Sequence, residues 1–371
     1  MSTVRLEATA RYLAERGLDG LLAFNNGQNS FLESNAVFVL SGVRPIGESA
    51  VLVDRDGGAS LIVTPAWDEA RVAALFGAGV AAGTDDLASA LAGVLQKHRV
   101  DPRRIVTVGL GTLGLDLARR IEAALGGAAP ADNDYTRDLA RVRAPDELAA
   151  ARRATAIAEA GYRRMLEVAR PGMREFELAA ELYCHMKALG AEDNFLLVSA
   201  SQHNLAVRAA GRRVLDVGDI ILSEITPCVG GQYAQLCRTT VIGEAPAAIH
   251  VKYPILQLAM RRGQEAAVPG ARVAEVTRAM DECFREAGYG DYCKPPYMRV
   301  RGHGLGITSD RPGDITSDSD IVLEEGMVFV MHPNQYLPET GYMMCGEPVV
   351  ILPGGAEALS SRRAELDVIP A

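Results

Sequence analysis

The chain has 371 residues, of which 48% are hydrophobic and 23% are charged, and its formal net charge is −9. This length is long for a single hydrophobic core and suits two domains. The negative charge argues against general binding to nucleic acid or anionic membranes, because neither offers an acidic protein a favourable counter-charge.

The cysteines and the N-terminus indicate the compartment. Six cysteines without a CxxC pair suit free thiols in a reducing environment. The first residues carry charges throughout and lack the apolar core of a signal peptide. No run approaches the roughly 18 apolar residues of a membrane span. We therefore expect a soluble, cytoplasmic protein that binds neither nucleic acid nor membrane.

Helix and strand patterns alternate in the first third of the chain. Residues 4–16 place Leu6, Ala10 and Leu13 on one face of a predicted helix. Short apolar runs predict buried strands at 21–24, 36–42, 49–54, 60–64 and 105–109. Further helical patterns occupy 66–76, 85–98 and 114–125. This alternation predicts an α/β domain, which we place at 1–135 because the stretch 126–135 is rich in turn residues.

The remaining chain, 136–371, begins with helices and continues as strands. A long helix starts after Pro145, where Asp146 meets the unpaired N–H groups of the first turn. A second helix ends at Gly190. Strand patterns follow at 195–200, 219–226, 233–243, 327–333 and 346–352, and two more helices are predicted at 248–266 and 273–287.

Five stretches of this second domain resemble one protein family in their order and spacing. They are LARVRAPDELAAAR, VARPGMREFELAAEL, LDVGDIILSEITPCVGGQYAQLCRTTVIG, RGHGLGI and LEEGMVFVMHP. The chain thus resembles the creatinase, aminopeptidase P and prolidase family, peptidase M24. The resemblance implies an α/β N-terminal domain and an α+β pita-bread C-terminal domain with a curved antiparallel sheet under helices. It also implies a homodimer.

The metal-dependent members of this family hold two divalent ions with Asp, Asp, His, Glu and Glu, in that order. The aligned positions here are Glu224, Gln235, His303, His332 and Glu347. Two carboxylates are thus replaced by neutral side chains, and the remaining two offer too little negative charge for a pair of divalent cations. By this criterion the chain is closest in character to creatinase-like, metal-independent members.

The positions that handle protons in the family are altered as well. The histidine ahead of the GD turn falls on Val207, with His203 nearby as a substitute if the loop is longer. The second histidine falls on Asp310. These changes argue against ordinary peptidase activity, and also against creatinase activity in the strict sense.

We therefore expect a hydrolase or lyase, creatinase-like and not a peptidase, that needs no cofactor and acts on a C–N bond of a small, polar, nitrogen-containing molecule. His303 or His332 would be the general acid or base, because imidazole titrates near neutral pH. Glu224 and Glu347 would bind a cationic group of the substrate.

Further residues are expected around the substrate. Tyr233 and Gln235 share one face of their predicted strand, and Arg238 and His203 complete the substrate-binding set. Cys228 and Cys237 are expected to be small core residues, not nucleophiles. In the dimer that the resemblance implies, Arg44 would reach the site of the partner chain.

Two alternatives remain open at this stage. His303, His332 and Glu347 supply the ligand set of a mononuclear zinc, iron or manganese site with open positions. The chain would then be a mononuclear metal-dependent hydrolase or a peptidase-like enzyme. The second alternative is a non-catalytic binding module on the same fold.

Overall fold

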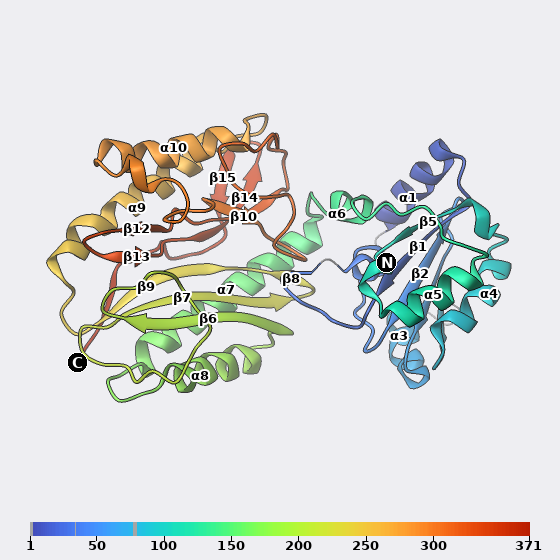
Figure 1. Cartoon of the computed structure of the whole chain (residues 1–371), viewed down its shortest axis with the longest axis horizontal. Helices are drawn as coiled ribbons and strands as arrows, with labels where there is room; N and C mark the ends of the chain where they lie inside the picture. The colour runs from blue at the N-terminus through green and yellow to red at the C-terminus, as the bar shows by residue number, and fades with distance from the viewer. Residues whose placement is uncertain (1–2, 34, 77–79) are drawn as a thin grey trace. The chain divides into compact units, whose positions relative to one another are not determined.

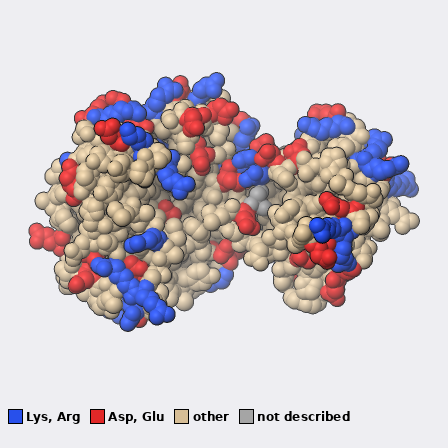
Figure 2. All heavy atoms as spheres, in the orientation of Figure 1, with Lys and Arg blue, Asp and Glu red and all other residues tan. Residues whose placement is uncertain are grey.

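The computed structural model describes residues 3–33, 35–76 and 80–371. It divides the chain into two compact units, Met1–Ala140 and Arg141–Ala371 (Figure 1), where the sequence placed the boundary between residues 135 and 136. Within those residues, no helix has the length and apolar character needed to cross a membrane. On the face drawn in Figure 2, acidic and basic side chains are interspersed over both units.

The first unit is built on one five-stranded sheet in the order β4-β3-β2-β1-β5. Strand β1 runs antiparallel to β2 and parallel to β5. The strands are β1 (Gly20–Asn25), β2 (Ser49–Asp54), β3 (Ala59–Val63), β4 (Ala81–Gly83) and β5 (Ile105–Val108). Because side chains alternate along a strand, Leu21 packs into one core and Leu22 into another.

Helices cover both faces of this sheet. The core that contains Leu21 also takes side chains from α1 (Thr3–Arg16), α2 (Ala36–Ser41), α3 (Glu69–Phe76) and α6 (Tyr135–Leu139). The core that contains Leu22 takes side chains from α4 (Leu87–Lys97) and α5 (Leu115–Ala124). The unit is thus the α/β layer that the alternation predicted.

The run at 36–42 was predicted as a strand, and that prediction was wrong. Residues Ala36–Ser41 form the helix α2, and all six are buried. The side chain of Asn35 accepts a hydrogen bond from the Phe38 N–H at 2.8 Å, and Gly42 ends the helix with φ 71°. Because every residue of the run is buried, hydrophobicity carries no period, and the two caps decide the conformation.

The second unit contains two sheets and a hairpin. The first sheet has the order β16-β9-β7-β6 with β8 paired to β7, the second has the order β10-β11-β14-β15, and β12 pairs with β13. Their bounds are β6 (Asp193–Ser201), β7 (Ile220–Val229), β8 (Gln232–Tyr233), β9 (Leu236–Ile242), β10 (Gly302–Gly304), β11 (Val328–Met331), β12 (Gln335–Leu337), β13 (Gly341–Met343), β14 (Glu347–Leu352), β15 (Gly355–Ala358) and β16 (Asp367–Ile369).

A single antiparallel bridge between Cys237 and Gly346 joins the two sheets. The Cys237 N–H donates to the Gly346 carbonyl at 3.1 Å, and the Gly346 N–H donates to the Cys237 carbonyl at 3.0 Å. We call this bridge the seam. It connects β9 to the residue just before β14.

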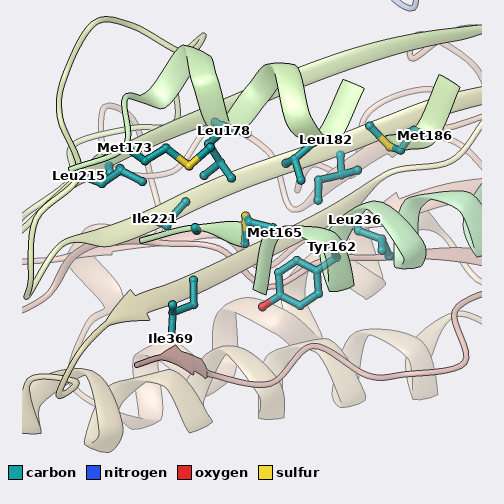
Figure 3. Close-up of a cluster of buried hydrophobic side chains, with 14 of the residues drawn as sticks. Tyr162, Met165, Met173, Leu178, Leu182, Met186, Leu215, Ile221, Leu236 and Ile369 are labelled. Carbon is teal, nitrogen blue, oxygen red and sulfur yellow. The ribbon is translucent and has the colours of Figure 1, made fainter. Parts of the chain in front are cut away.

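Four long helices cover the sheets of the second unit: α7 (Pro145–Val168), α8 (Glu175–Ala188), α9 (Ala247–Ala266) and α10 (Val273–Glu286). One face of the first sheet packs against α7 and α8, as Figure 3 shows. Side chains labelled there include Tyr162, Met165, Leu178, Leu182, Met186, Ile221 and Leu236. We call this the helix face of the sheet, and the opposite one the site face.

The substitution Leu182→Ala should destabilise the chain by about 2–5 kcal/mol, because it leaves a cavity at a fully buried position of the helix face. The matched control is Leu189→Ala, since Leu189 is 49% exposed, and we expect it to stay within about 0.5 kcal/mol of the parent. Urea unfolding followed by circular dichroism measures both. Equal losses would contradict the assignment of the core.

Candidate active site

The register of the strands decides which side chains share the site face. Ile221 and Ile225 of β7 lie on the helix face. Glu224 is one residue before Ile225, so its side chain points to the opposite face, the site face. Glu224 is paired with Cys237, and residues directly opposite one another lie on the same face. The site face therefore carries Glu224 and Cys237.

The seam brings a histidine next to Glu224 and Cys237. Cys237 is bridged to Gly346. A Cβ atom on Gly346 would lie 2.7 Å from the His332 Cβ and 2.9 Å from the Cys237 Cβ. Only glycine fits between these two side chains. Glu224, Cys237 and His332 thus form one row across both sheets.

A second histidine joins this row from β10. The His303 and His332 rings lie edge to face, with centroids 5.3 Å apart. Burial lowers the pKa of both, that of His332 to about 3 with a further contribution from His303. Both imidazoles are therefore neutral at pH 7, which is the form that accepts protons or binds metal ions.

The protonation of each ring follows from its contacts. His303 Nδ1 lies 2.8 Å from the Gly304 carbonyl oxygen, so Nδ1 carries the proton and the lone pair is on Nε2. His332 Nδ1 is buried, and no group in the described part of the chain hydrogen-bonds to it. A buried ring nitrogen left in this way points to an external partner.

Glu224 is the carboxylate of the row. Burial raises its pKa to about 7, and a hydrogen bond from Gln235 acts in the opposite direction. Gln235 is 1% exposed. Since the amide of Gln235 donates to Glu224, its oxygen needs another donor, and the residues that the structure describes provide none.

Thr226 is a site-face residue that the sequence reasoning missed. It follows Glu224 by two positions on β7, it is fully buried, and its hydroxyl also has no hydrogen-bond partner among the described residues. The alternation along DIILSEIT contained the signal, because residues two apart share a face. Unpaired polar atoms on Thr226, Gln235 and His332 indicate that a substrate or solvent normally occupies this face.

Glu347 does not join the histidines. It follows Gly346 by one residue, so its side chain points away from the site face and toward the side on which Arg238 lies. There its Oε1 lies 3.0 Å from Arg238 Nη2, and both side chains are at most 3% exposed. Burial raises the pKa of Glu347, and Arg238 opposes that rise. The predicted set of His303, His332 and Glu347 is therefore not brought together.

Arg238 is bound on several sides. Its Nη1 donates to the Gly346 carbonyl at 2.7 Å and to the Cys237 carbonyl at 3.0 Å. Its guanidinium lies 5.5 Å from the centroid of the Tyr162 ring. These contacts hold the two ends of the seam, so Arg238 has a structural place on the helix face and not a place against the substrate.

The other predicted substrate-binding residues are scattered. Tyr233 is fully buried and donates to Asp193 Oδ2 at 2.7 Å. His203 Nε2 lies 3.1 Å from the Pro338 carbonyl, in an exposed turn. Arg44 belongs to the first unit, where it lies 5.2 Å from the Phe38 ring centroid. The homodimer, and the reach of Arg44 into a partner's site, stay predictions.

Both cysteines near the site are fully buried. Cys228 and Cys237 have no exposed surface, and burial, with Glu224 as a second cause, raises the pKa of the Cys237 thiol. A thiol that stays protonated is a poor nucleophile. This placement agrees with the interpretation of both as small core residues.

The donor set tests the metals that the family resemblance implies. In residues 3–33, 35–76 and 80–371, no three His, Cys, Asp or Glu side chains form a group that would hold a metal ion. With Glu347 bound to Arg238, Glu224 is the one carboxylate left in the row, too little negative charge to bridge two divalent cations, so a dinuclear centre does not fit. The neutral imidazole pair, with His332 Nδ1 unpaired among the described residues, supplies two nitrogen donors of the kind that a divalent ion accepts.

Comparisons with known proteins place this geometry in context. A model of metallopeptidase family M24 matches residues 149–353. The Xaa-Pro dipeptidase of Pyrococcus furiosus is 25% identical over 367 residues, which cover 98% of this chain and 99% of that protein. The probable dipeptidase PepE of Mycobacterium bovis is 30% identical over 250 residues, which cover 67% of this chain and 66% of that protein.

Solved structures show the same fold. The crystal structure of X-Pro aminopeptidase from Thermotoga maritima matches this chain with a TM-score of 0.84 at 23% identity, covering 98% of this chain and 99% of that one. The predicted combination of an α/β domain with a pita-bread domain is confirmed.

Three parts of the sequence-based prediction were wrong. The matching family is one of metallopeptidases, which overturns the metal-independent and creatinase-like assignments. The similar proteins are named as dipeptidases, which overturns the exclusion of peptidases. The error was to treat the loss of two carboxylates as the loss of the family's chemistry, although a hydrolytic site also depends on neutral imidazoles and proton-transfer groups.

The substitution Arg238→Gln should destabilise the chain by about 3–5 kcal/mol, because it leaves the Glu347 carboxylate buried without its cation. The control is Arg262→Gln. Arg262 pairs with Glu286 at 2.9 Å with both side chains exposed, so we expect a loss of at most about 1 kcal/mol. Chemical denaturation measures both, and Arg238→Gln combined with Glu347→Gln should recover part of the loss.

The stability of the chain should fall as Glu224 loses its proton. The pKa of Glu224 is about 7 in the native state and about 4.3 in an unfolded chain, so the stabilisation is complete below pH 4.3 and is lost as the pH rises to 7. Glu224→Gln cannot ionise and should lack this loss, which we expect to be about 3–4 kcal/mol. Urea unfolding of both proteins from pH 4.5 to 8.5 measures the difference. Parallel curves would contradict the raised pKa.

Proposed function

Since this chain belongs to metallopeptidase family M24, as its five motifs predicted, we propose that it is a peptidase that hydrolyses the amide C–N bond of small peptides. The observation that carries this proposal is the row of proton-transfer groups and unpaired polar atoms on the site face of the second unit. The names of the similar proteins, Xaa-Pro dipeptidase among them, make a dipeptide with a carboxyl-side proline the first substrate to examine.

One divalent ion, held by His303 and His332, would serve this site. Both imidazoles are neutral because of their burial, and neutral imidazole is the ligand that zinc, iron and manganese accept. When bound, such an ion supplies polarisation of the peptide carbonyl and a lowered pKa for a coordinated water.

Glu224 is the proposed general acid and base. With a pKa of about 7, it accepts a proton as the water oxygen bonds to the peptide carbonyl carbon, and it donates that proton to the leaving amine nitrogen as the C–N bond breaks. A group whose pKa lies close to the working pH is the most effective in both directions.

Gln235 and Thr226 orient the reacting groups. The Gln235 amide holds the Glu224 carboxyl through its hydrogen bond, and its oxygen would accept from an N–H of the substrate. The hydroxyl of Thr226, two residues beyond Glu224 on β7, would donate to a substrate oxygen. Such fixed partners keep the reacting atoms in place and add no cost of reorganisation during the reaction.

The test is hydrolysis of Xaa-Pro and other dipeptides by protein stripped with chelator and then supplied with zinc, iron or manganese. We expect activity to depend on added metal and Glu224→Gln to lower kcat by about 10²–10⁴-fold. His332→Ala should remove the response to metal. The control is His250→Ala, because His250 lies exposed on α9, and it should match the parent.

Elemental analysis separates one ion from two. One equivalent per chain, lost in His332→Ala, is the expected result. Two equivalents would overturn the single-ion part of the proposal. Full dipeptide hydrolysis by Glu224→Gln would overturn the assigned role of Glu224, and the absence of hydrolysis with every metal and dipeptide would overturn the peptidase itself.

A further inference from the structure

The loop that joins β5 to α5 in the first unit has a glycine spacing that the fold explains only in part and the peptidase site does not explain. It reads Gly-Leu-Gly-Thr-Leu-Gly over residues 109–114, directly after a strand and before a helix. In the G-x-G-x-x-G arrangement the glycines let the backbone approach the phosphates of a nucleotide. The spacing alone does not define a binding site; a cavity and an unpaired polar group beside the loop would.

A cavity of about 510 Å³ lies against this loop. It opens at the carboxyl ends of β1 and β5, which are neighbouring parallel strands. Its lining includes Asn26 just past β1 and Gly109, Gly111 and Thr112 just past β5, together with residues at the start of α6. Ligands of α/β sheets bind at this edge, and the volume suits a small molecule.

The fold requires glycine at one position of the loop but not at another. Gly109 has φ 72°, and a Cβ there would lie 2.5 Å from the Phe24 carbonyl oxygen, so the fold requires it. Gly111 has no left-handed φ, and among the described residues no atom lies within 4 Å of the position of a Cβ. Packing therefore does not demand glycine at 111. The absence of a side chain at Gly111 leaves the backbone uncovered beside the cavity.

An unpaired buried hydroxyl in the wall of the cavity points to a ligand independently. Thr136 is 1% exposed and lines the cavity. Its Oγ1 has no hydrogen-bond partner in the part of the chain that the structure describes. Buried hydroxyls are normally paired, so an acceptor oxygen on a bound molecule would complete this one.

Most polar groups of the wall are donors. Arg137 contributes a guanidinium, which also lies 3.3 Å from the exposed Asp134. The Asn133 oxygen accepts from the Gly109 N–H at 2.9 Å, and the Asn26 oxygen accepts from the Gln28 N–H at 2.8 Å, so each amide has its NH₂ left to donate. The charges and donors favour a ligand with anionic oxygens.

Glu33 is the acidic residue of the wall. A carboxylate repels a phosphate but accepts hydrogen bonds from the hydroxyls of a sugar, as an acidic residue does in dinucleotide sites. A ligand that carries both a phosphate and neighbouring hydroxyls satisfies Glu33 and the donors together.

We propose that this cavity binds a phosphate-bearing small molecule with a sugar-like hydroxyl part, such as a mononucleotide or a sugar phosphate. The phosphate lies on the 109–112 loop with Thr136 and Arg137, and the hydroxyls lie toward Glu33. All the residues that line the site belong to the first unit.

Isothermal titration of the full-length chain with AMP, ribose 5-phosphate, adenosine and inorganic phosphate tests this assignment. We expect binding of AMP, of ribose 5-phosphate or of both, and much weaker binding of adenosine. Thr136→Val should weaken the binding of the phosphorylated probe about tenfold or more, while Thr136→Ser, which keeps the hydroxyl, should stay close to the parent.

The matched steric pair is Gly111→Leu and Gly93→Leu. Gly93 in α4 also has open space at its Cβ position and does not line the cavity, so only Gly111→Leu should block binding. Equal binding of AMP and adenosine would overturn the role of the phosphate. Unchanged affinity in both Thr136→Val and Gly111→Leu, or no binding of any phosphorylated probe at millimolar concentration to the folded chain, would overturn the site.

Discussion

The ion pair between Arg238 and Glu347 is the interaction on which the second unit depends most. Two fully desolvated charges are costly to bury unless each is well paired, and here the guanidinium also binds the Cys237 and Gly346 carbonyls. The pair therefore fixes β9 against β14 where two sheets meet. It also decides which carboxylate remains available on the opposite face, and that carboxylate is Glu224.

Because Glu347 is paired with Arg238, Glu224 is the carboxyl group left on the site face. The site face has one carboxyl with a raised pKa, two neutral imidazoles, and polar atoms of Gln235 and Thr226 without partners among the described residues. A site with so little negative charge suits one cation better than two. The groups that titrate or accept protons, Glu224, His303 and His332, nevertheless lie together on this face.

The sequence predicted the fold well and the site only in part, for physical reasons. Motifs such as RGHGLGI and LEEGMVFVMHP indicated the family and the pita-bread domain because their order and spacing along the chain match those of that family. The helix at Ala36–Ser41 was missed because a fully buried run has no hydrophobic period. Glu347 was placed with the histidines, but a shift of one residue moves a side chain to the other face of a strand. Only the pairing of Cys237 with Gly346 reveals this.

Cys237 sits at the seam beside Gly346, fully buried and protonated, whereas Cys184 is exposed on α8. An alkylating reagent reaches a buried thiol only when the surrounding strands separate. The rate at which Cys237 is labelled therefore reports how often β9 and β14 come apart, with Cys184 as the internal standard for reagent reactivity. The Cys237 thiol, unreactive in the folded chain, thus reports the local opening of the strands beside Glu224 and His332.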